Sequence, residues 1–119
     1  MTIPAMMRAA VITASGGPEV FAIEQRPVPV PGPAEVLVRV RASAINRADI
    51  LQRMGRYPAP AGVPADIPGL EFAGEVMACG ADARDWQPGD RVCGLVGGGA
   101  HADRRRTSPH TTPWCFRRS

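Results

Sequence analysis

The sequence predicts a small, mainly β fold with one short helix, and three observations support this. Short runs of β-branched and aliphatic residues alternate with clusters of Gly, Pro, Asp and Ser. Only one segment carries both a helix start signal and a helix stop signal. The chain has 119 residues, of which 45% are hydrophobic and 21% charged, so it can form the core of one domain. We therefore expect a single barrel or sandwich.

The first half of the chain predicts three strands. Residues 8–13 and 20–25 form the first two, separated by turn residues at 15–18. Residues 26–33 contain four prolines, which lack the N–H needed for a ladder, so this segment is an extended connector. Residues 35–42 alternate most clearly, with Val36, Val38 and Val40 expected on one face.

The expected helix follows directly. Asn46 is a favourable N-cap, and Asp49 stands three residues later in a capping-box position. Ile45 and Ile50 are spaced as a hydrophobic staple, and Gly55 ends the helix after about two turns. On this interpretation Asn46 and Asp49 need no further function.

The second half predicts a loop and two more strands. Residues 57–69 are rich in proline and are expected to be an irregular loop of the kind that often carries function. Strands are expected at 72–77 and 91–96. Residues 87–90 precede the second strand and read Gln-Pro-Gly-Asp, a type II turn. The glycines at 97–99 end this strand.

The positive charge is confined to the end of the chain. All 11 acidic residues lie before residue 104, whereas residues 104–119 hold five arginines and no acid. The net charge of +3 therefore gives no basic face to the fold, which argues against nucleic-acid binding and against electrostatic membrane binding. We expect residues 104–119 to be a disordered tail that adds no ordered core. No apolar run spans a bilayer and no secretion signal is visible, so we expect a cytoplasmic protein.

Motifs that carry chemistry are few. Gly97-x-Gly99-x-x-Ala102 formally fits a dinucleotide fingerprint, but no helical pattern follows it, which favours a glycine-rich turn. His101 and His110 do not pair with a cysteine at zinc-finger spacing, and no metal site is expected. The three cysteines lack CxxC spacing and are expected to be small buried hydrophobes. No Ser-His-Asp arrangement is readable.

Several longer motifs resemble those of a known enzyme family. The segments 42–57 (ASAINRADILQRMGRY), 68–76 (PGLEFAGEV) and 88–92 (PGDRV) occur in the family's order, after the opening residues 8–11 and 16–19. Together they resemble the zinc-free NAD(P)H:quinone oxidoreductases of the medium-chain dehydrogenase/reductase superfamily, in particular the zeta-crystallin and p53-inducible quinone oxidoreductase type. The resemblance covers roughly residues 7–102.

The resemblance implies a fold and a site. Residues 7–103 would form a GroES-like, partly open β-barrel with one short helix, which in the family precedes a Rossmann domain. NADPH would lie between the two domains and deliver hydride to a quinone. Zinc-dependent relatives have Cys and His where Asn46 and Leu70 stand, so no metal is implied. Asn46 and Tyr57 would border both nicotinamide and substrate, as the cofactor-binding and catalytic residues.

The sequence departs from the family after Ala102. Shifting the reading frame from Arg106 onward permits YVTAPHDALVLP, which resembles the family's continuation, so we infer a frameshift near residues 104–106; a natural basic tail is the alternative. A chain truncated before its Rossmann domain is expected to be inactive alone and to self-associate through the exposed domain interface. The alternatives to a quinone oxidoreductase are a non-catalytic GroES-like binding module and another zinc-free reductase, such as an enoyl reductase.

Overall fold

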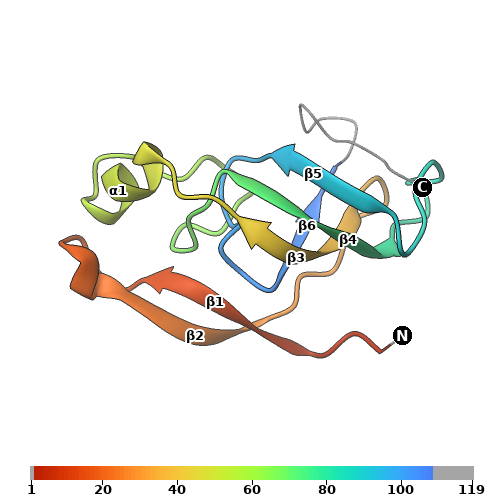
Figure 1. The fold of residues 1–119 in the computed structure, drawn as a ribbon, viewed down its shortest axis with the longest axis horizontal. Coiled ribbons are helices and arrows are strands. Elements are labelled where there is room, and N and C mark those ends of the chain that lie inside the picture. Colours follow the sequence, from red (N-terminus) through yellow and green to blue (C-terminus); the bar gives the residue numbers. More distant parts are fainter. Residues whose placement is uncertain (1, 109–119) are drawn as a thin grey trace.

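The computed structural model describes residues 2–108, which form two open sheets and one short α-helix (Figure 1). The elements are β1 (Met6–Ile12), the 3-10 turn η1 (Pro18–Val20), β2 (Phe21–Pro27), β3 (Val36–Ser43), α1 (Arg47–Arg53), β4 (Glu71–Cys79), β5 (Arg91–Leu95) and β6 (Arg104–Thr107). The predicted mainly β fold with one short helix is confirmed. Neither sheet closes into a barrel within these residues.

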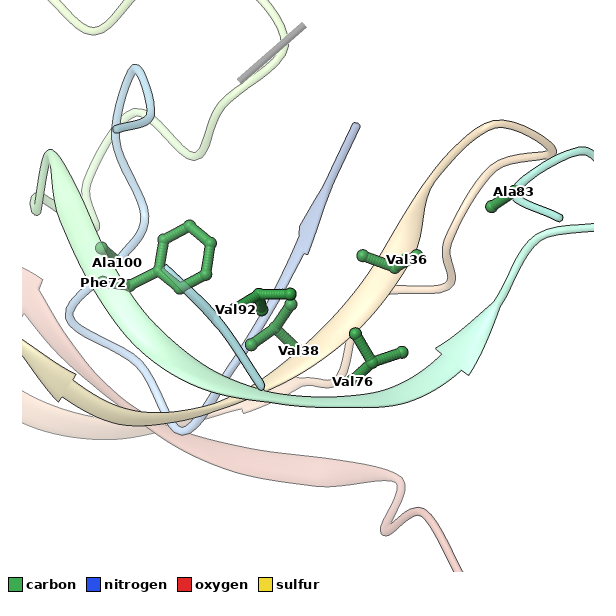
Figure 2. Packing of buried hydrophobic residues seen from close by; sticks show 7 residues of the cluster. All are labelled: Val36, Val38, Phe72, Val76, Ala83, Val92 and Ala100. Atoms are coloured by element: carbon green, nitrogen blue, oxygen red, sulfur yellow. The ribbon is translucent and has the colours of Figure 1, made fainter. Parts of the chain in front are cut away.

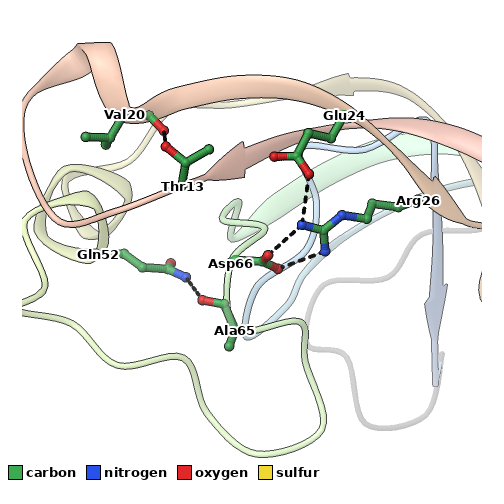
Figure 3. Close-up of polar contacts among 7 residues, drawn as sticks. All are labelled: Thr13, Val20, Glu24, Arg26, Gln52, Ala65 and Asp66. Carbon is green, nitrogen blue, oxygen red and sulfur yellow. Dashed lines mark hydrogen bonds and ion pairs between the residues drawn. The ribbon is translucent and has the colours of Figure 1, made fainter.

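The first sheet is the antiparallel hairpin of β1 and β2, in which Met6 pairs with Pro27 and Ile12 with Phe21. Both the N–H and the hydroxyl of Thr13 donate to the Val20 carbonyl, at 2.9 and 2.7 Å, which closes the hairpin (Figure 3). A bridge between Ala9 and Ala102 joins the hairpin to the rest of the domain.

The second sheet has the strand order β5-β4-β3-β6, and all its neighbours are antiparallel. β3 and β4 approach closely at Gly74, where an added Cβ would lie 2.1 Å from the Arg39 carbonyl oxygen. The predicted turn before β5 is present, because Asp90 N–H donates to the Gln87 carbonyl at 3.1 Å and Gly89 has φ +96°.

The main core lies on one face of the larger sheet (Figure 2). Its buried members are Val36, Val38, Phe72, Val76, Ala83, Val92 and Ala100, with Val40 packed against them. Val36 and Val38 are fully buried, and they share a face with Val40 as predicted. Leu37 is only 1% exposed, so the opposite face of β3 is also covered at its start.

The expected irregular loop at 57–69 is confirmed, and side chains from two elements hold its far end (Figure 3). The Gln52 amide donates to the Ala65 carbonyl at 3.1 Å. Arg26 donates to both carboxylate oxygens of Asp66, at 2.7 and 3.3 Å. The loop is therefore irregular in backbone but tied to α1 and β2.

Two expectations are wrong. The chain is not a disordered tail from residue 104, since Arg104–Thr107 forms β6 and pairs with β3 from Val36↔Thr107 to Arg39↔Arg104. A free strand edge offers backbone donors and acceptors regardless of side-chain type, which is why an arginine-rich segment can occupy it. Ile45 is 83% exposed, so it forms no staple with Ile50. The expectation for residues 109–119, which include Cys115, lies outside the described residues.

Candidate functional site

The polar cluster at the start of α1 is organised by Asn46 and Asp49. The Asn46 N–H donates to Asp49 Oδ2 at 3.0 Å, as the predicted capping box requires. The Asn46 side-chain amide donates to Glu71 Oε2 at 3.1 Å. The Asn46 side chain therefore joins the start of α1 to Glu71 at the start of β4, 25 positions along the chain.

His101 extends this cluster into a three-residue chain. Its Nε2 lies 2.9 Å from Asp49 Oδ2, and its Nδ1 lies 2.7 Å from Ser43 Oγ. Asp49 accepts only, so the ring proton is assigned to Nε2, and Nδ1 then accepts from the Ser43 hydroxyl. The side chains of His101 and Asp49 are 16% and 6% exposed, whereas Ser43 is exposed. Such a chain can pass a proton between the buried carboxylate and the surface.

The backbone fixes the position of His101. Its N–H donates to the Pro68 carbonyl at 3.0 Å, and its own carbonyl accepts from Ala10 N–H at 2.9 Å. Gly69 packs so closely that an added Cβ would lie 2.7 Å from His101 N. The loop end and β1 together hold the ring in place. The sequence contained no signal for this, since Ser43 and Asp49 are 58 and 52 positions from His101.

A pocket of about 530 Å³ opens beside this chain. Its polar members are Ser43, Asp49, His101 and Arg53, and its apolar members are Ala10, Phe21, Ile45 and Ile50. An apolar pocket with a few convergent polar groups is the usual form of a small-molecule site. This lining suits an apolar small molecule that carries a polar group.

The second predicted site residue, Tyr57, lies apart from the cluster's hydrogen bonds. It is half-buried, opens the irregular loop, and forms no hydrogen bond with another described residue. Its hydroxyl is thus available to a ligand. Asn46 and Tyr57 do not contact each other through any hydrogen bond, and Leu70 is half-buried beside Glu71.

The other candidate features of the sequence give no second site. Among residues 2–108, no group of three or more His, Cys, Asp or Glu side chains could hold a metal ion. Gly97–Gly99 is followed by a bridge at Ala102 and then β6, not by a helix, so the predicted glycine-rich turn is confirmed. Cys79 and Cys93 are unpaired and half-buried, and burial raises the pKa of the Cys79 thiol. No helix in this part of the chain is long and apolar enough to cross a membrane.

The chain is similar to parts of larger oxidoreductases. A quinone oxidoreductase of Pseudomonas aeruginosa is 45% identical over 84 residues, which is 71% of this chain and 25% of that protein. The trans-enoyl reductase RAP2 of Pyricularia oryzae is 41% identical over 98 residues, or 82% of this chain and 26% of that protein. The crystal structure of a human synaptic vesicle membrane protein VAT-1 homolog-like protein superposes with a TM-score of 0.83 at 29% identity, covering 96% of this chain and 36% of that one.

The family assignment rests on the profile match as well. The family described as "Alcohol dehydrogenase GroES-like domain" matches residues 32–113, more than half of the chain. The chain spans about a quarter of the length of the curated relatives that it matches. It belongs to the alcohol dehydrogenase GroES-like domain family, and with it to the medium-chain dehydrogenase/reductase superfamily.

Proposed function

We propose that this chain is the substrate-side domain of a zinc-free, NADPH-dependent quinone oxidoreductase of the cytoplasm. The observation that carries the proposal is the polar cluster of Asn46, Asp49, Glu71 and His101 beside an apolar pocket. Similarity to a quinone oxidoreductase supports the choice of substrate class. Asn46 and Leu70 stand where the superfamily's zinc enzymes have Cys and His, which supports zinc-free chemistry.

The nicotinamide cofactor, when bound, supplies the hydride, and the residues of this chain position the acceptor and move a proton. Tyr57 donates its hydroxyl proton in a hydrogen bond to a quinone oxygen. Asn46 borders the nicotinamide, held in orientation by Glu71. For the proton transfer, His101 first takes a second proton from solvent at Nδ1, so that Nδ1 donates to Ser43 Oγ across the 2.7 Å contact. The Ser43 hydroxyl proton then passes to the reduced oxygen as the Nδ1 proton passes to Ser43, which leaves His101 with its Nε2 proton alone.

Asn46 and Tyr57 are the residues that we propose to border the nicotinamide, whereas the described residues offer no cradle for the pyrophosphate. Pyrophosphate binding in dinucleotide folds uses a glycine turn that opens a helix, and here a strand follows Gly97–Gly99. We therefore propose that this chain alone neither binds NADPH at micromolar affinity nor reduces quinones. Calorimetric titration tests this, and a micromolar dissociation constant would contradict it.

Nuclear magnetic resonance of the 15N-labelled chain tests the substrate site. Adding 9,10-phenanthrenequinone is expected to shift the amide signals of Ile45–Asp49, Tyr57 and His101. Loss of one hydrogen bond in Tyr57→Phe is expected to weaken this binding by about 3–10-fold. Ser15→Ala, which removes a hydroxyl that does not line this pocket, serves as the control. Shifts confined to other surfaces, or equal binding by Tyr57→Phe, would refute the proposed site.

An enoyl reductase is the second candidate function, favoured by the 41% identity to a trans-enoyl reductase. Both substrates are conjugated carbonyl compounds that take up one hydride and one proton, so the same residues would serve. A crotonyl thioester that shifts the Tyr57 and His101 signals when the quinone does not would favour this reading. A non-catalytic binding module would be favoured by a stoichiometric protein partner with no response to either small molecule.

A further inference from the structure

A second pocket, of about 890 Å³, lies against β6. It shares no residue with the polar cluster of Asn46, Asp49, Glu71 and His101. One wall carries three consecutive arginines, Arg104, Arg105 and Arg106. The rest is mainly apolar, with Val30, Val63, Pro64, Ile67, Leu95 and Val96 among its members. The volume falls in the range that holds a drug-sized ligand.

The charges in this pocket are only partly balanced. Arg106 donates to Glu35 Oε1 at 3.2 Å, and the same oxygen accepts from Gly32 N–H at 2.8 Å. Arg104 and Arg105 form no hydrogen bond or ion pair with another described residue, and the Nε atom of each is enclosed without a partner. Glu35 lines the same pocket, but neither it nor any other described carboxylate lies within ion-pair distance of Arg105.

The Arg105 guanidinium is destabilised in its charged form by this arrangement. Burial, and then the neighbouring charge of Arg106, lower the pKa of its guanidinium to about 10, and Glu35 opposes the change only in part. A buried charge is usually paired, because desolvation is expensive. Perturbed groups that lie in a cleft without a structural partner are candidate binding residues.

Gly99 locates the guanidinium of Arg105 within the pocket. An ideal Cβ at this position would lie 2.8 Å from Arg105 Nη1, and Gly99 has φ +79°. The positive φ favours glycine here. The short distance places the Arg105 guanidinium beside Gly99 and the apolar wall that Val63 and Pro64 help to form.

We propose that this pocket binds an amphipathic monocarboxylate, with its carboxylate on the guanidinium of Arg105 and its hydrocarbon part against the apolar wall. Guanidinium and carboxylate match in shape as well as charge. The carboxylate of Glu35, which also lines the pocket, disfavours a dianion such as inorganic phosphate. The apolar members give a hydrocarbon tail contacts that a bare ion cannot use.

Calorimetric titration of the whole chain with sodium octanoate tests the proposal. Octanoate is expected to bind at least about tenfold more tightly than 1-octanol or inorganic phosphate, because only octanoate uses both halves of the pocket. Arg105→Leu is expected to weaken octanoate binding at least about tenfold. Arg91→Leu removes an exposed arginine on β5 outside the pocket, and its affinity for octanoate is expected to stay within about twofold of that of the parent.

Three results would overturn the proposal: equal binding of octanol, equal binding of phosphate, or unchanged octanoate binding by Arg105→Leu. Circular dichroism of each variant shows whether it is folded. If Arg105→Leu does not fold, Arg105→Lys carries the test, because it keeps the charge but loses the two-point contact. The affinity of Arg105→Lys for octanoate is expected to be lower than that of the parent but still measurable. Parent-like affinity in Arg105→Lys would count against recognition by the guanidinium.

Discussion

The Arg105→Leu variant is expected to be more stable than the parent chain at pH 7. The Arg105 guanidinium has its Nε enclosed without a partner among the described residues, and burial lowers its pKa to about 10. Leucine occupies part of the same space without a charge to desolvate. Replacing a poorly compensated buried charge with an apolar side chain is often stabilising.

The magnitude follows from the change in pKa. A lowering from 12.5 to about 10 corresponds to an upper bound of about 3 kcal/mol in the free energy of unfolding at neutral pH. Water reaches part of this half-buried side chain, and leucine loses some packing of the arginine stem. We therefore expect a net gain of about 1–2 kcal/mol, which raises Tm by roughly 4–10 °C in a domain of this size.

Urea denaturation between pH 7 and pH 11 is the assay, because the sign of the pH dependence is fixed. The pKa of Arg105 is lower in the folded than in the unfolded chain, so its destabilising effect is complete at neutral pH and is relieved as pH rises through about 10. The difference in the free energy of unfolding between Arg105→Leu and the parent should therefore become smaller above that pH. Arg91→Leu, at an exposed site, should differ little from the parent. Lower stability of Arg105→Leu at pH 7, or a difference independent of pH, would refute the reasoning.

Three further predictions concern the rest of the domain. Deleting residues 104–119 should lower the free energy of unfolding by about 1–3 kcal/mol, because the pairing of β6 with β3 is lost; an unchanged thermal melt would contradict this. Gly74→Ala should cost at least about 3 kcal/mol in the same melt, since its Cβ would lie 2.1 Å from the Arg39 carbonyl oxygen, and a parent-like Tm would exclude that contact. The parent chain should self-associate through Phe21, Ile45 and Ile50, which are 38%, 83% and 39% exposed. Ile45→Asp should shift sedimentation velocity profiles towards monomer, whereas a monomeric parent would rule this out.

Most local signals agreed with the structure, and the exception is the staple expected between Ile45 and Ile50. The capping contact between Asn46 and Asp49 spans three residues and formed as expected. The turn at 87–90 needed only proline and a glycine with positive φ, and Gly89 has φ +96°. The alternation in β3 placed Val36 and Val38 in the core. The capping contact and the turn join residues within a few positions, so local geometry suffices for them, and the alternation in β3 needs only a strand with one face on the core.

The candidate site was only partly predictable. Asn46 was expected from its place in a family motif, whereas the chain from Ser43 through His101 to Asp49 had no sequence signal. Its members come from β3, from α1 and from the segment before β6, and its two contacts join residues 58 and 52 positions apart. No residue spacing encodes contacts of that range, because the packing of separate elements creates them.

The sequence by itself determined the strand and turn pattern, the start of α1 and the family. Only the tertiary structure showed that Arg104–Thr107 is a strand, because by composition this segment resembles a solvated tail. Its backbone completes hydrogen bonds along the free edge of β3, and those bonds do not depend on side-chain polarity. The side chains then follow the strand: Thr107 is buried, and Arg105 lies against the apolar pocket. A charge pattern read along the chain could not show this, because burial is set by neighbours distant in sequence.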